Sequence, residues 1–223
     1  MARAHKAWAL HLVRGMRTIL AVLMLATAAA AAPLLPTAAP PLGIDAATVP
    51  APCTPFLQQA VVPAPVAAMT ARISLAQCIA GERLRAHRDL IDAQDSIELV
   101  DDSVAASMTL LDAVIATDAP RLVIEAQHAK GELYAQMIAR MLATLPAPAA
   151  GAGDDAMQLR EQRVAVLATW LQPWRDAAHD AFAAVVSLGK LHPELARDPV
   201  VQQAVRDSSQ RLDREPAKVA TSS

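Results

Sequence analysis

The chain has 223 residues, 54% of them hydrophobic and only 3% aromatic, and its 20 basic and 22 acidic residues give a formal net charge of −2. This length is enough for one domain with a substantial core or for two small ones. An acidic balance without a basic stripe argues against nucleic-acid binding and against attraction to an anionic membrane surface.

Residues 1–32 have the layout of a secretory signal peptide. Basic residues lead into an apolar run over residues 18–32, which ends in small residues followed by Pro33. The stretch that begins at Met16 has the same layout, so Met1 and Met16 are both candidate starts. Cleavage would remove four basic residues and no acidic one, which makes the mature chain more acidic.

The leader predicts a periplasmic or secreted protein of a bacterial cell envelope, with cleavage between Ala28 and Ala32. The alternative is an uncleaved N-terminal anchor, although a membrane-spanning helix needs about 20 apolar residues. In that case membrane contact would be limited to the N-terminal segment.

Residues 33–65 are rich in proline and alanine and hold nine of the sixteen prolines. Proline lacks a backbone donor and disfavours helix in the residue before it, so we expect an extended or irregular linker arm. The two cysteines are Cys53 in this arm and Cys78 beyond it. In an oxidising compartment we expect them to form a disulfide that fastens the arm to the first helix.

Residues 66–212 are predicted to form one helical domain. The stretch 66–117 contains no proline and one glycine, and from Leu84 onward its apolar residues recur every three or four positions. We expect a bend or break between Gly81 and Asp89, and the pattern leaves open whether this stretch is one helix or two.

A second helix is predicted from Thr117 or Asp118 to about Leu145, and PAPAAGAG then forms a loop. A third is expected to begin at Asp154 or Asp155 and run toward Leu188, with a kink or restart at Pro173.

A short helix should follow, capped at Asp198–Pro199 and ending near Leu212, and the polar residues 213–223 form a disordered tail. The predicted fold is therefore all-α: an antiparallel helical bundle of three long helices and one or two short ones, preceded by the Pro/Ala-rich arm.

Two carboxylate–histidine pairs have the spacing that helical bundles use for dinuclear metal centres: Glu125 with His128, and Asp176 with His179. The apolar seams of the two helices place all four residues off the packing face. We therefore interpret both pairs as solvent-facing, and expect no metal site and no cofactor.

Three polar residues lie on or near the predicted inward faces: His87, Gln94 and Tyr134. We expect His87 and Gln94 to form a buried or half-buried hydrogen-bonded pair that fixes helix register, and the alternative is a ligand site. Trp174 is expected in the core. For Trp170 we favour core packing over the alternative, an exposed anchor for a protein partner or an apolar ligand.

The sequence contains no GxSxG, SxxK, HExxH, P-loop or GxGxxG motif. We therefore expect a non-catalytic interaction or scaffold module of the cell envelope, acting through a protein partner or self-association. The alternative is a bundle that binds a small apolar ligand or a metal ion in its interior. An enzyme of unrecognised class is the third hypothesis.

Overall fold

The computed structural model describes residues 41–145 and 153–214, all of which belong to one unit of the fold. About 81% of these residues are helical, in seven α-helices and three short 3₁₀ turns, and none of them forms a strand. The all-α prediction is confirmed. The predicted signal peptide and both candidate starts lie outside the described residues, as do residues 33–40, most of the PAPAAGAG loop and residues 215–223 of the predicted tail.

The described part of the Pro/Ala-rich stretch is more helical than expected. It forms two 3₁₀ turns, η1 (Ala46–Thr48) and η2 (Ala51–Cys53), and helix α2 (Thr54–Ala60). Pro55 lies in the first turn of α2, where no backbone donor is needed. Phe56 and Leu57 then pack against the main core. The prediction of extended or irregular chain is therefore wrong over these turns and α2.

The stretch 66–117 is two helices, α3 (Pro65–Ala86) and α4 (Gln94–Ile115). The break falls at residues 87–93, and Gly81 lies inside α3. Backbone groups of residues 87–93 form hydrogen bonds with side chains that lie outside this connection. Arg140 Nη2 donates to the carbonyl of His87, and the amide of Ile91 donates to Ser96 Oγ, 3.1 Å away.

The later helices also differ in number from the prediction. Helix α5 spans Pro120–Leu142, without a side-chain cap from Thr117 or Asp118. The predicted third helix is two, α6 (Asp154–Trp170) and α7 (Gln172–Leu191), and Pro173 lies in the first turn of α7. The expectation of three long helices is therefore wrong in number, whereas the expected restart at Pro173 is confirmed, because a new helix with Pro173 in its first turn begins after Leu171.

The last elements are the 3₁₀ turn η3 (Pro193–Leu195) and helix α8 (Pro199–Arg214). The predicted cap at Asp198 is confirmed, since its Oδ1 accepts hydrogen bonds from the amides of Val200 (2.9 Å) and Val201 (3.2 Å). These bonds satisfy donors that the first turn of a helix leaves without partners.

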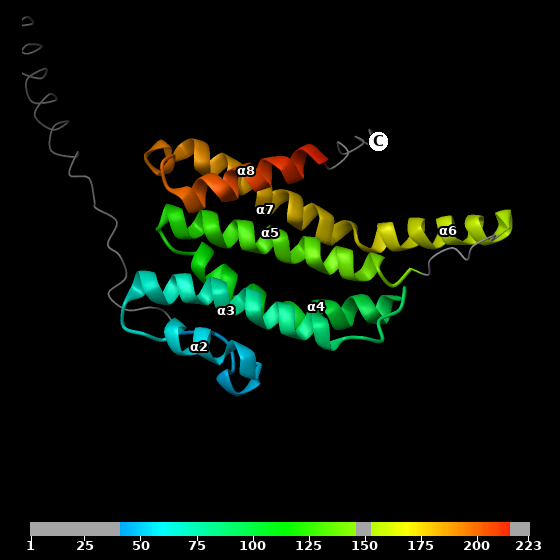
Figure 1. Cartoon of the computed structure of the whole chain (residues 1–223), viewed down its shortest axis with the longest axis horizontal. Helices are drawn as coiled ribbons and strands as arrows, with labels where there is room; N and C mark the ends of the chain where they lie inside the picture. The colour runs from blue at the N-terminus through cyan, green and yellow to red at the C-terminus, as the bar shows by residue number, and fades with distance from the viewer. Residues whose placement is uncertain (1–40, 146–152, 215–223) are drawn as a thin grey trace, which may run out of the picture. The chain divides into compact units, whose positions relative to one another are not determined.

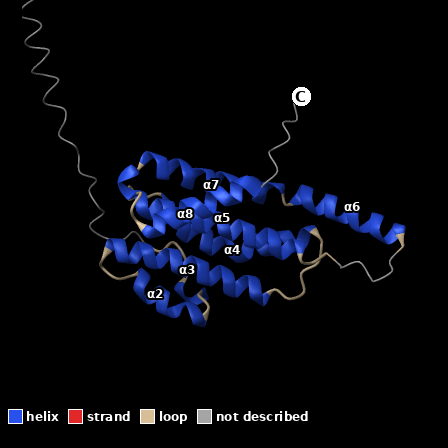
Figure 2. Cartoon of the chain, turned by 45° about the horizontal axis from the view of Figure 1, so that its top comes forward, coloured by secondary structure: helices blue, strands red, loops and turns tan. Residues whose placement is uncertain are grey.

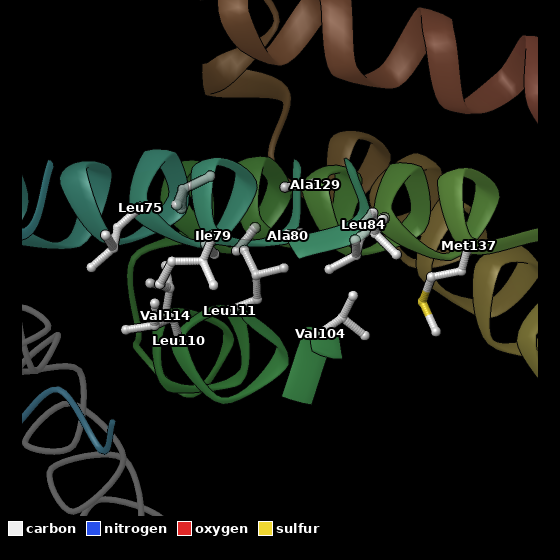
Figure 3. Close-up of a cluster of buried hydrophobic side chains, with 14 of the residues drawn as sticks. Leu75, Ile79, Ala80, Leu84, Val104, Leu110, Leu111, Val114, Ala129 and Met137 are labelled. Atoms are coloured by element: carbon white, nitrogen blue, oxygen red, sulfur yellow. The ribbon is translucent and has the colours of Figure 1, made fainter. Parts of the chain in front are cut away.

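Helix α5 is the central element of the packing. It packs against α7 and α4 and also contacts α3 and α8, while α2 covers α3 (Figure 1). The main core lies between α3, α4 and α5 (Figure 3). The side chains labelled in that view are Leu75, Ile79, Ala80, Leu84, Val104, Leu110, Leu111, Val114, Ala129 and Met137.

A smaller core joins the other side of α5 to the C-terminal helices. Ile124 of α5, Val185 of α7, and Val201 and Ala204 of α8 are all buried there. No helix in the described part of the chain is long and apolar enough to cross a membrane.

The close approach of α5 and α7 depends on Gly131. A Cβ atom at this position would lie 2.6 to 2.9 Å from the ring atoms of Phe182, which is 1% exposed and has little room to move. The ring of Phe182 therefore occupies the space that any larger residue at position 131 would need.

We expect Gly131→Ala to destabilise the protein by about 1–3 kcal/mol, because overpacking a filled core outweighs the gain in helix propensity. Gly81→Ala is the matched control. It is also inside a helix, but its Cβ would meet only Arg85 Nη2 at 3.6 Å. It should leave stability unchanged or raise it by up to about 1 kcal/mol. Urea unfolding followed by circular dichroism measures both, and equal stability of the two variants would contradict the packing argument.

Candidate functional site

The Sγ atoms of Cys53 and Cys78 lie 2.10 Å apart, at disulfide distance, and the two Cα atoms are 5.7 Å apart. The predicted pairing is confirmed. It fastens the turn η2 to helix α3, and Cys53 is fully buried at the junction. Closing a loop with a sequence separation of 25 stabilises a fold by about 3.5 kcal/mol in the loop-entropy model.

A stripe of polar residues on α5 faces α8. Its members recur at helical spacing: Arg121, Glu125, His128 and Glu132. Arg121 Nε donates to Asp198 Oδ2 at 2.8 Å, and Arg211 donates to both carboxylate oxygens of Glu132 at 2.9 and 2.7 Å. These contacts join the whole length of α8 to the flank of α5.

Glu125 and His128 lie in the middle of this stripe, and the prediction that they face solvent is wrong. The side chain of Glu125 is only 12% exposed, and His128 is half-buried. His128 Nδ1 is 3.1 Å from Oγ of the buried Ser208, and its ring lies 6.1 Å from the ring of Phe182. The apolar seam marks one packing face of α5, whereas α8 covers a second face that carries these two residues.

Both residues line a groove of about 450 Å³ between α3, α5 and α8, which we call the His128 groove. Its wall on α3 is mostly polar and includes Ser74 and Gln77, and its wall on α8 includes Val200 and Ala204. A volume of a few hundred Å³ with both polar and apolar walls is in the range of small-molecule sites.

Burial shifts the pKa values of the two groups in opposite directions. Desolvation raises the pKa of Glu125, against the attraction of Arg121, whose Nη1 is 3.0 Å from Glu125 Oε1. That ion pair is not aligned as a hydrogen bond, so the buried Oε1 lacks a donor. Desolvation lowers the pKa of His128, although the carboxylates of Glu132 and Asp207 oppose the shift.

The lowered pKa of His128 predicts a specific loss of stability in acid. The unfolded chain takes up a proton near its ordinary pKa of 6.5, whereas the folded chain resists it, so stability falls as pH falls below about 6.5. Glu125 acts in the opposite direction, because its raised pKa makes the folded state bind protons more readily.

We therefore expect His128→Asn, which keeps Glu125, to lose less stability than the native chain from about pH 8 to about pH 5. Urea midpoints at the two pH values test this. Parallel losses in both proteins would mean that His128 is not the group responsible.

The second predicted pair, Asp176 and His179, lies on α7, and both side chains are half-buried, so the prediction that they face solvent is wrong here too. Asp176 Oδ1 accepts a hydrogen bond from Gln172 Nε2 at 3.0 Å, within the same helix. Among the described residues, no group of three or more His, Cys, Asp or Glu side chains is placed to hold a metal ion. The two pairs are therefore not brought together in such a group.

The three residues expected to face inward occupy separate places. His87 is half-buried at the C-terminal end of α3, and Gln94 is exposed at the start of α4, where its Nε2 donates to Glu98 Oε1 at 3.3 Å. The predicted His87–Gln94 pair is wrong because the break at residues 87–93 interrupts the helical spacing that would bring the two side chains together. Tyr134 is half-buried against the main core, and desolvation raises its pKa.

Trp174 is buried as predicted, but Trp170 is 38% exposed, so core packing is the wrong prediction for Trp170. It belongs to a row of exposed apolar side chains at helical spacing, Leu159, Val166 and Trp170, which we call the α6 row. Leu167 is the one fully buried residue that α6 provides. Helix α7 is the main contact of α6, which extends beyond the other helices in both views (Figures 1 and 2).

A second groove was not predicted from the sequence. Its charged lining residues are Arg85 and Arg88 at the end of α3 and Arg140 near the end of α5. A continuous helix would pair Arg85 with Asp89 and Arg88 with Asp92. Because α3 ends at Ala86, Arg85 pairs instead with Glu82 at 2.7 Å.

The chain matches no protein-family model, and neither the curated proteins nor the solved structures include a match. The α6 row and the two grooves are therefore the features of the molecule that bear on its function.

Proposed function

We propose that the chain is a non-catalytic interaction or scaffold module of the bacterial cell envelope that binds a protein partner, or a second copy of itself, through the α6 row. The observation that carries this proposal is the exposure of Leu159, Val166 and Trp170, which are 54%, 48% and 38% exposed on one face of a helix. Exposed apolar rows of this kind, with a tryptophan at one end, are typical of protein-binding surfaces.

The proposed architecture is an antiparallel helical bundle on which α6 is presented. Short connections support it, since helices joined by a few residues usually return alongside one another. The connections are residues 116–119 between α4 and α5 and residues 192–198, including η3, between α7 and α8. The members of each of these pairs pack against each other.

The α6 row can be tested by replacing Leu159, Val166 and Trp170 with glutamine. We expect the triple variant to lose at least about tenfold in capture of its partner from native envelope, or in self-association, since a buried tryptophan anchor contributes about 2 kcal/mol or more. Met157→Gln is the matched control, because Met157 is 51% exposed but lies on the opposite face of α6.

Quantitative mass spectrometry of captured proteins and light scattering after gel filtration provide the two readouts, with circular dichroism to confirm folding. A monomeric native chain that enriches no protein, or equal capture by the triple variant, would contradict the proposal.

Export is the second half of the proposal, and the leader and the Cys53–Cys78 disulfide support it. Protein recovered from the periplasm should have the intact mass of a chain that lacks the leader. Its cysteines should resist alkylation until a reductant is added. A full-length mass would instead indicate an uncleaved anchor, and free thiols in freshly recovered protein would contradict oxidative export.

A second candidate function is binding of a small molecule between the helices. The observation that favours it is the pair of grooves, of about 450 and 610 Å³. A metal ion is less well supported as the ligand, because none of His87, Gln94 and Tyr134 lines either of these two grooves. An enzymatic role has no geometric support beyond the half-buried Glu125 and His128, and is the third candidate.

A further inference from the structure

The larger groove has a volume of about 610 Å³ and lies where the C-terminal ends of α3 and α5 meet. Leu84, Ala139 and Ala143 give it apolar surface, while Arg85, Arg88 and Arg140 give it positive charge. We call it the arginine groove. Three guanidinium groups in one groove are unusual in a chain whose overall charge is negative.

Two of the three arginines have partners inside the protein. Arg85 Nε donates to the carbonyl of Gly81 at 3.0 Å and its Nη2 pairs with Glu82. Arg140 donates through Nη2 to the carbonyl of His87. Bonds from arginine to the carbonyls at the end of a helix are an ordinary stabilising feature, and these account for part of the charge.

Helix capping does not account for the remaining positive charge of the groove. The Nε atom of Arg140 is buried and has no acceptor. Arg88 is exposed, follows the end of α3, and makes no ion pair or hydrogen bond with the described residues. Glu82 is the one carboxylate paired with any of the three in the described part of the chain. The three arginines and Glu82 together carry a formal charge of about +2, which the neighbouring Asp89 and the negative ends of α3 and α5 reduce.

This balance of charge and shape identifies a class of ligand. A phosphate monoester carries a charge of about −1.5 to −2 at neutral pH and offers several acceptor oxygens, which arginine forks bind in pairs. The apolar surface beside the guanidinium groups can accommodate a short organic group. We propose that the arginine groove binds the phosphate group of a small organic phosphate. This inference is independent of contact through the α6 row, which is not part of the groove.

The experiment is calorimetric titration of the purified chain at low ionic strength with glycerol phosphate, with inorganic phosphate and with uncharged glycerol. Flotation with vesicles that contain or lack phosphatidic acid tests whether the phosphate belongs to a lipid. We expect saturable binding of glycerol phosphate and none of glycerol. Binding to phosphatidic acid vesicles without binding of the soluble ester would also support the groove and would assign the phosphate to a lipid headgroup.

Variants locate the site. Arg88→Gln should weaken binding by about tenfold, and it should fold normally because Arg88 is exposed and lies outside the helices. Adding Arg140→Gln should abolish the remaining affinity. Arg197→Gln is the matched control, since Arg197 is exposed and does not line the groove.

Two results would overturn the proposal. One is the absence of saturable binding by any phosphate probe. The other is equal weakening by Arg88→Gln and Arg197→Gln, which would indicate diffuse attraction to net charge. Equal affinity for inorganic phosphate and for the ester would overturn the proposed role of the apolar surface.

Discussion

The contact of Gly131 with Phe182 is the constraint on which the rest of the packing depends. It allows α5 and α7 to approach closely, and α5 is also covered by α3, α4 and α8. A helix with neighbours on so many sides has little surface left for water, so even its polar flank is enclosed. The enclosed flank has to be matched by polar groups from α8, because a buried charge or hydroxyl without a partner is costly.

The stripe from Arg121 to Glu132 shows how that matching is achieved. Arg121 meets the capping residue Asp198, His128 meets the buried Ser208, and Glu132 meets Arg211. The hydrogen bond from Arg121 lowers the pKa of Asp198, while burial raises the pKa of Glu125 in the same stripe. Glu125 is thus the least compensated member, and it lines the His128 groove. The half-site motif in the sequence therefore marks a place where burial disfavours charge, with no metal cluster around it in the described residues.

The elements that could be predicted are those that residues close together in the sequence determine. The apolar repeat predicts helices, Asp198 followed by proline predicts a helix start, and two cysteines in an exported chain predict a bond. A break between Gly81 and Asp89 and a restart at Pro173 could be predicted, but the extent of the first break could not, because Arg140 satisfies the carbonyl of His87 from a distant position in α5. The arginine groove depends on the first break, since the separation of Arg88 from Asp92 follows from the end of α3 at Ala86. A register argument based on one face also misses a helix such as α8, which packs on a second face.

Helix α6 differs from its neighbours in what holds it together. Isolated helices shorter than about 12–15 residues are marginal in water, and longer ones in proteins depend mainly on packing of an apolar face. Over its 17 residues α6 buries only Leu167 and leaves Leu159, Val166 and Trp170 exposed. Arg163, on the same side as this row, reaches Asp92 of the α3–α4 connection at 3.6 Å, which is a weak restraint for an exposed pair. The packing of α6 within the chain therefore contributes little to its stability. A partner that covered the α6 row would supply the apolar burial that the other long helices obtain from each other.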